Sequence, residues 1–318
     1  MIEAQAVPHD PRPAIPVRWL TLAVCGSAAV VFGLMVHNGL SIAWHDGTLY
    51  ALAVACAVLG VLRWRTHDAP THALHRTRDF AENGLLLIAM TVLGGLASYA
   101  AAADTRGFLD AGLERGDVLL HFHWLAWYET VVRHPVLQHL GAAAYASIYP
   151  APWMLIGAMA WRGERARARR FLATFWLAAM LTLALFPMFP AKGALDHLWH
   201  GPIPYMPTSG LYQGEIIPML REHTFGAIHV NALRGLVCAP SFHTVCATLF
   251  IAAAWPMARL RWLLIPMNSA MLLATPVEGT HYLTDMLMGL VVGLTALALM
   301  RVIAPWLERS VPERPFFG

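Results

Sequence analysis

Long apolar runs alternate with short polar segments along nearly the whole chain. A helix that crosses the hydrocarbon core of a bilayer needs about 20 largely apolar residues, and eight runs approach that length. They cover residues 18–36, 48–63, 83–103, 138–161, 170–190, 238–257, 261–277 and 281–304. The second, seventh and eighth runs have the shortest uncharged stretches, so six or seven spans stay open as alternatives. The pattern predicts an all-α, polytopic integral membrane protein with about eight transmembrane helices.

Two polar segments between the apolar runs are much longer than the others. Residues 104–137 contain Trp124, Trp127 and Tyr128, and aromatic side chains of this kind favour the membrane–water interface. We therefore expect a short helix there that lies on the bilayer surface. Residues 191–237 are rich in proline, glycine and aromatic residues. A long segment of this kind, without regular structure, is often functional.

The basic residues fall unevenly on the two sides of the predicted membrane. With the N-terminus inside, the inner segments carry 16 of the 22 lysine and arginine residues and the outer loops carry 6. Because cytoplasmic loops carry the excess of positive charge, both termini are expected in the cytoplasm. The expected location is the bacterial inner membrane, with the two long segments on the periplasmic side. The basic run 162–170 lies inside and is expected to bind the anionic leaflet.

The composition agrees with a membrane protein and excludes several other classes. Of the 318 residues, 58% are hydrophobic and only 13% are charged, whereas soluble domains carry about 25% charged residues. The mean hydropathy is +0.52. The net charge of +3 comes from dispersed loop residues, which gives no basis for nucleic-acid binding. The four cysteines form neither a CxxC pair nor a disulfide framework.

Four ionisable residues from three parts of the chain stand at one predicted membrane level. His243 lies at the outer end of the sixth run, His281 and Asp285 lie at the outer end of the eighth, and Lys192 follows the fifth. Ionisable side chains at this depth usually face the bundle interior or a water-filled cavity. The four residues are therefore expected to meet inside the bundle, near its outer face.

The spacing of His281 and Asp285 predicts a catalytic pair. Residues four apart share one face of a helix. A carboxylate there can accept the proton of one imidazole nitrogen and leave the lone pair of the other nitrogen free to attack. His243 would then be a general acid that protonates a leaving oxygen, because imidazole titrates near neutrality.

A metal site made of His281, Asp285 and His243 is one alternative. The chain has no HExxH-type arrangement, and hard oxygen ligands are sparse around these residues. We therefore expect neither a metal nor a cofactor. A non-catalytic, transporter-like membrane protein is the other alternative, and the absence of repeated halves and of paired discontinuous spans in the sequence speaks against it.

The motifs around these residues resemble those of the type-2 phosphatidate phosphatase superfamily. Pro240-Ser241-Phe242-His243 matches the superfamily's Pro-Ser-x-His motif. Residues 274–289, which include His281, Tyr282, Asp285 and Gly289, are similar to the last motif of the branch that contains fungal inositol phosphorylceramide synthase. Residues 113–150 are similar to an upstream region of that branch. The resemblance covers roughly residues 83–318. It implies a six-helix catalytic membrane domain at 81–318, after a cytoplasmic tail and two accessory spans at 1–80.

The resemblance also implies a reaction and assigns roles to residues. It implies a metal-independent lipid phosphatase or head-group phosphotransferase that acts on a phospholipid or lipid phosphate. The acceptor would be water or an alcohol such as inositol or a sugar. His281 would be the nucleophile that forms a phosphohistidine, Asp285 would orient it, and His243 would protonate the departing lipid alcohol. Ser241 would contact the phosphate.

One position departs from the superfamily pattern. Thr275 stands where other superfamily members carry an arginine, six residues before the last histidine. The charge of a phosphoryl transition state needs fixed cations or hydrogen-bond donors around it. Lys192 and Arg234 are therefore expected to bind the substrate phosphate, with Arg221 behind them.

Overall fold

The structure, a computed structural model, describes residues 13–67 and 71–309. These ranges fold into thirteen α-helices and two short 3-10 helices, and they contain no β-strand. The predicted all-α class is confirmed. The α-helices are α1 Val17–His37, α2 Gly47–Arg65, α3 His72–Ala103, α4 Asp110–Leu119, α5 Trp124–Arg133, α6 Pro135–Ala146, α7 Pro150–Trp161, α8 Arg165–Leu185, α9 Ala194–Leu198, α10 Gln213–Arg221, α11 Phe242–Ala254, α12 Arg261–Glu278 and α13 Leu283–Arg309.

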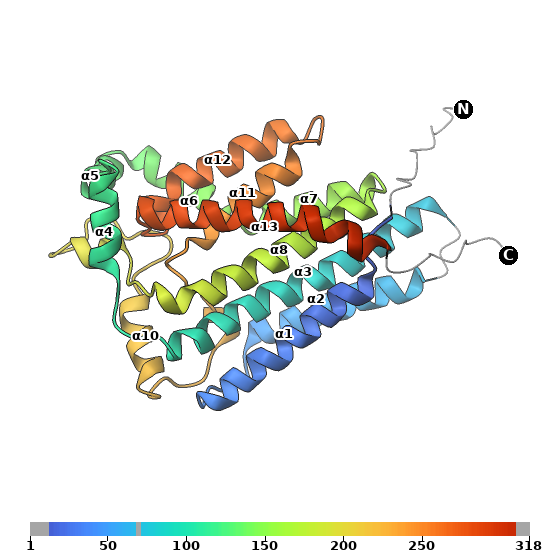
Figure 1. Cartoon of the computed structure of the whole chain (residues 1–318), viewed down its shortest axis with the longest axis horizontal. Helices are drawn as coiled ribbons and strands as arrows, with labels where there is room; N and C mark the ends of the chain where they lie inside the picture. The colour runs from blue at the N-terminus through green and yellow to red at the C-terminus, as the bar shows by residue number, and fades with distance from the viewer. Residues whose placement is uncertain (1–12, 68–70, 310–318) are drawn as a thin grey trace.

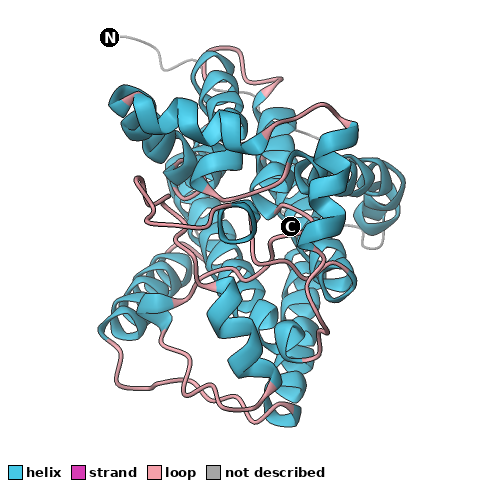
Figure 2. Ribbon diagram, turned by 90° about the vertical axis from the view of Figure 1, so that its left-hand side faces the viewer, coloured by secondary structure: helices cyan, strands magenta, loops and turns pink. Residues whose placement is uncertain are grey.

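The long helices lie side by side in one bundle (Figure 1). The short helices α4, α5 and α10 gather at one end, whereas α1 begins and α13 ends at the opposite end. Figure 2 looks onto the end that carries the short helices and shows loops crossing in front of the helix ends. The bundle therefore has one end covered by loops and short helices, and this loop-covered end carries the candidate site.

Within residues 13–67 and 71–309, five helices are long and apolar enough to cross a membrane. They are Val17–His37, Gly47–Arg65, His72–Ala103, Arg165–Met188 (α8 with the 3-10 turn that follows it) and Leu283–Arg309. They correspond to the first, second, third, fifth and eighth predicted spans. The other three predicted spans are also helical, but α11 has only 13 residues and α12 is not among the five. The count of eight spans stays a prediction.

Residues 138–161 form two helices instead of the single predicted one. Helix α6 ends at Ala146, and α7 begins at Pro150. Proline has no N–H to donate, so Pro150 cannot extend the hydrogen-bonding pattern of α6. The chain therefore stops one helix and starts another at this position.

The two long segments are more helical than the sequence predicted. Residues 104–137 form α4 and α5, where one surface helix was expected, and His121 between them has a φ of 56°. Helix α5 buries Trp124 and Tyr128 and leaves Trp127 exposed. Residues 191–237 contain α9 and α10.

The central core joins the helices that carry the site. Leu155 of α7, Leu172 of α8, Val245 of α11 and Ala296 of α13 are all fully buried in one apolar cluster. At the loop-covered end, α13 approaches the start of α11 so closely that a Cβ at Gly289 would lie 2.4 Å from the backbone oxygen of Ser241. Only glycine fits there, and this contact sets the distance between the two helices.

The basic run 162–170 forms ion pairs within the protein. Arg165 pairs with Asp79 at 2.8 Å, Arg169 pairs with the buried Glu82 at 2.7 Å, and Arg170 pairs with Glu308 at 2.5 Å. Arg162 and Arg167 both pair with Glu164. The run therefore fastens α8 to α3 and α13. The sequence analysis predicted only a contact with anionic lipid for this run. It did not indicate these carboxylate partners, because most of them are far away in the sequence.

Candidate active site

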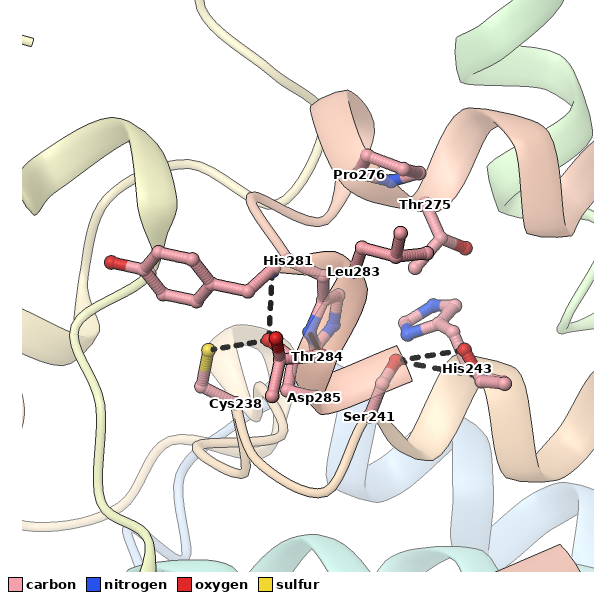
Figure 3. Close-up of polar contacts among 12 residues, drawn as sticks. Cys238, Ser241, His243, Thr275, Pro276, His281, Leu283, Thr284 and Asp285 are labelled. Carbon is pink, nitrogen blue, oxygen red and sulfur yellow. Dashed lines mark hydrogen bonds and ion pairs between the residues drawn. The ribbon is translucent and has the colours of Figure 1, made fainter. Parts of the chain in front are cut away.

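His281 and Asp285 form a buried hydrogen-bonded pair at the start of α13 (Figure 3). The imidazole Nδ1 lies 2.9 Å from the carboxylate Oδ1, and the two residues are 4% and 0% exposed. An ionised carboxylate can only accept a hydrogen bond, so Nδ1 carries the proton and Nε2 keeps its lone pair. The geometry matches the arrangement that the four-residue spacing predicted.

The second oxygen of Asp285 is also held. Its Oδ2 accepts a hydrogen bond from the backbone N–H of Tyr282 at 2.8 Å, and it lies 3.8 Å from the thiol of Cys238. The backbone oxygen of Asp285 accepts from the N–H of Ser241 at 3.1 Å. The carboxylate is therefore fixed at both oxygens, and α13 is joined directly to the turn that precedes α11.

His243 lies in the first turn of α11, opposite His281. Ser241 is the N-cap of this helix, because its hydroxyl accepts from the N–H of Thr244 at 3.4 Å. The ring centroids of His243 and His281 are 6.2 Å apart. Tyr145 of α6 stacks on His243 at 4.0 Å, and its hydroxyl lies 3.3 Å from the Nδ1 of His243. Two imidazoles from different helices thus face each other, and one is oriented by a tyrosine.

The surface helices α4 and α5 position the start of α13. Trp124 of α5 donates its indole N–H to the backbone oxygens of Pro276 and His281, at 3.0 and 3.1 Å. Asp117 of α4 accepts hydrogen bonds from the N–H groups of Leu283 and Thr284 and from the Thr284 hydroxyl. It satisfies N–H groups that a helix start leaves without partners. Burial raises the pKa of Asp117, and these donors lower it in part.

Asp110 of α4 binds the turn at residues 192–193 and also Tyr282, which follows His281. It accepts hydrogen bonds from the N–H groups of Lys192 and Gly193 at 3.0 and 3.1 Å, and from the hydroxyl of Tyr282 at 3.1 Å. Gly193 has a φ of 108°, and a Cβ there would lie 2.5 Å from the hydroxyl oxygen of Thr280. The turn at 192–193 therefore packs against the residue that precedes His281.

The cation side chains of Lys192 and Arg234 lie in the loop layer. The ammonium of Lys192 is 5.4 Å from the ring centroid of Phe108. The guanidinium of Arg221 lies over the same ring, 4.6 Å from its centroid. Arg234 donates to the backbone oxygen of Ser209 at 2.9 Å and lies over the ring of Tyr212.

The structure thus brings together four of the six residues expected at the site: Ser241, His243, His281 and Asp285. Within residues 13–67 and 71–309, neither Lys192 nor Arg234 hydrogen-bonds to any of them. Thr275 is fully buried and donates its hydroxyl to Met271 of its own helix. The role of the two cations stays a prediction.

Glu278, at the end of α12, is a further buried carboxylate of this region. One of its oxygens accepts from the hydroxyl of Tyr205 at 2.7 Å, and the other accepts from the N–H and the hydroxyl of Thr208, at 3.0 and 2.6 Å. Glu278 therefore holds the loop around residues 205–208 against the end of α12, three residues before His281.

Sequence reasoning missed six residues that build this region: Asp110, Asp117, Trp124, Tyr145, Cys238 and Glu278. Their partners lie far away along the chain, so no local spacing indicated them. The one available signal was the presence of acidic residues in the long segments between apolar runs, in a chain that has few charges. Among the described residues, Cys238, His281 and Asp285 also form a group of metal-type ligands, with donor atoms within 4.8 Å of one another.

The fold and the site together define a helical membrane protein with two facing histidines, one of them paired with a carboxylate, an arrangement suited to phosphoryl transfer. Residues 112–299 match the family model of the PAP2 superfamily, the family that the motifs resemble. This match covers more than half of the chain, and the chain belongs to that superfamily. Membership supports a phosphatase-type activity on lipid phosphates. No curated protein and no solved structure matches the chain.

Proposed function

We propose that the protein is a membrane-embedded lipid-phosphate phosphotransferase or phosphatase that works through a phosphohistidine on His281. The observation that carries the proposal is the buried His281–Asp285 pair, with the ring of His243 at 6.2 Å from that of His281. A phosphoryl group between the two rings would have a nucleophile on one side and a proton donor on the other. The membership of the PAP2 superfamily supports the same chemistry.

In the first half of the proposed reaction, Nε2 of His281 attacks the phosphorus. The bond from phosphorus to the lipid oxygen breaks, and His243 in its protonated form donates a proton to that oxygen. The neutral lipid alcohol leaves. Asp285 holds the Nδ1 proton of His281 and stabilises the positive charge that the imidazole acquires.

In the second half, the acceptor resolves the phosphohistidine. His243, now neutral, takes a proton from the acceptor hydroxyl, whose oxygen attacks the phosphorus. The bond from phosphorus to Nε2 breaks, and both histidines return to their starting states. Water as acceptor yields inorganic phosphate from a lipid phosphate, whereas an alcohol yields a new phosphate ester.

The start of α11 and two cations are proposed to bind the phosphate. The N-terminus of a helix offers free N–H groups and the positive end of the helix dipole, and Ser241 and His243 lie there. Lys192 and Arg234 would add positive charge once their side chains turn from Phe108 and Tyr212 toward the bound phosphate. No metal ion is required for these steps.

We further propose that the site faces the periplasm, with eight spans in the bacterial inner membrane and both termini in the cytoplasm. The uneven distribution of basic residues supports this orientation. Transfer to an alcohol such as inositol or a sugar is the first choice for the second step, because the motifs resemble the inositol phosphorylceramide synthase branch. Hydrolysis by water is the alternative.

Product analysis tests the proposed function. Detergent-purified protein is incubated with radiolabelled phosphatidate and phospholipids, with and without inositol or a sugar, and with a chelator in parallel. We expect turnover that resists the chelator and that yields a labelled phosphodiester or phosphomonoester only when the alcohol is present. Release of inorganic phosphate in every mixture would establish the phosphatase alternative instead.

Two controls complete the product analysis. The His281→Ala variant should give no product with any lipid, because it lacks the nucleophile. Absence of turnover by the parent protein on every lipid would contradict the proposal and favour a transporter-like protein.

A further inference from the structure

A thiol, an imidazole and a carboxylate lie close together beside the proposed nucleophile. They belong to Cys238, His281 and Asp285. Their donor atoms all lie within 4.8 Å of one another, and all three residues are buried. Cys238 comes from the segment before α11, and the other two come from the start of α13. In Figure 3, Cys238 lies on one side of the His281–Asp285 pair and His243 lies on the other. The thiol therefore stands away from the face where His243 meets His281.

The distances suit a tetrahedral metal ion. Zinc binds cysteine sulfur at about 2.3 Å and histidine nitrogen or carboxylate oxygen at about 2.0 Å, so its ligand atoms stand roughly 3.3–3.8 Å apart. The Sγ of Cys238 is 3.8 Å from the Oδ2 of Asp285, and the Nδ1 of His281 is 2.9 Å from Oδ1. These two contacts go to different oxygens of Asp285, so the side chains would shift to bring one donor atom from each residue into the coordination sphere. Thiolate and imidazole together favour zinc over magnesium or calcium.

We propose that these three residues form an inhibitory site for zinc, with a water molecule as the fourth ligand. The metal would replace the proton that His281 shares with Asp285. The Cys238 thiol proton would leave to solvent, and the imidazole proton would move from Nδ1 to Nε2. Nε2 would then have no lone pair for attack on phosphorus.

This consequence for activity rests on the proposed function, whereas metal binding itself does not.

The test compares the full-length parent protein with Cys238→Ser and, as a matched control, Cys25→Ser. Serine can still donate a hydrogen bond to Asp285 but is a poor zinc ligand, and Cys25 lies exposed on α1, away from the three ligands. We expect zinc to inhibit the parent and Cys25→Ser at equal concentrations. The half-inhibitory concentration should rise by at least about 100-fold in Cys238→Ser, because loss of an outer partner alone costs 10–100-fold.

Cobalt titration provides a readout that does not need activity. Cobalt bound to Cys238 should give a thiolate charge-transfer absorption at one equivalent in the parent, and none in Cys238→Ser. Equal inhibition of the parent and Cys238→Ser by zinc, or a cobalt absorption that survives in Cys238→Ser, would overturn the proposal. If the protein shows the cobalt absorption but acts on no phospholipid, the metal site stands and the proposed function fails.

Discussion

Replacing His281 with glutamine is expected to lower turnover by about 10⁴–10⁶-fold. Losses of this size are seen when one member of a set of cooperating catalytic residues is replaced. Glutamine keeps much of the size of the side chain but offers no nitrogen lone pair to the phosphorus. The measurement is the initial rate of product formation by purified protein, with thermal unfolding followed in parallel.

A matched histidine variant controls for this result. His139 is exposed on α6, and among the described residues its hydrogen-bond partner is the backbone oxygen of Pro135. His139→Gln should therefore keep the parent rate. A His281→Gln variant that retains a rate within about tenfold of the parent would remove His281 from the role of nucleophile.

Asp285→Asn should have the second largest effect, a fall in kcat of about 10³–10⁴-fold with little change in KM. The amide carries no negative charge to stabilise the imidazolium, and its NH₂ group can donate to Nδ1 and impose the wrong tautomer. Nδ1 and Oδ1 are 2.9 Å apart and both residues are buried, so the substitution acts directly on the imidazole. Steady-state kinetics and a melting curve measure the two effects separately.

Asp117→Asn is a useful comparison for this variant. Asp117 of α4 is also a buried carboxylate, and it accepts hydrogen bonds from Leu283 and Thr284 at the start of α13 but not from His281. Asp117→Asn should therefore lower the melting temperature and leave kcat close to that of the parent. If Asp285→Asn instead lowered only the melting temperature and kept the parent kcat, Asp285 would have a purely structural role.

The hydrogen-bonded pair of His281 and Asp285 was predictable because the spacing that indicates it is local. A spacing of four positions is enough to place His281 beside Asp285, although His281 precedes the helix and the pair spans its first turn. The approach of His243 to His281 was predictable only through topology, because both lie at the same end of predicted spans. The two inferences used apolar run lengths and helix geometry alone.

The supporting residues could not be predicted because their contacts join distant segments. Asp110 and Tyr282 are 172 residues apart, and Trp124 and His281 are 157 apart. Nothing in the pattern around Tyr145 indicated that it would stack on His243, since an apolar run with one tyrosine is ordinary. The same holds for Cys238, which as a small residue gave no sign of its contact with Asp285.

The fold shows the same division between local and distant information. Apolar run length predicted helices in all eight segments, and Pro150 could have indicated the break between α6 and α7. The direction in which a side chain points could not be predicted from the sequence. The backbone position of Lys192 shortly after α8 followed from the sequence, but the placement of its ammonium over Phe108 depends on α10 and on the loop before α4.

The most direct test of the central claim is capture of the phosphorylated enzyme. The parent protein is mixed with lipid substrate labelled in the phosphoryl group, quenched in alkali within milliseconds, digested and analysed by mass spectrometry. A phosphoryl group on the peptide that contains His281, stable in alkali and lost in acid, is the predicted result, and His281→Gln should give none. A labelled peptide that contains His243 instead, or turnover with no labelled protein at any time, would contradict the account.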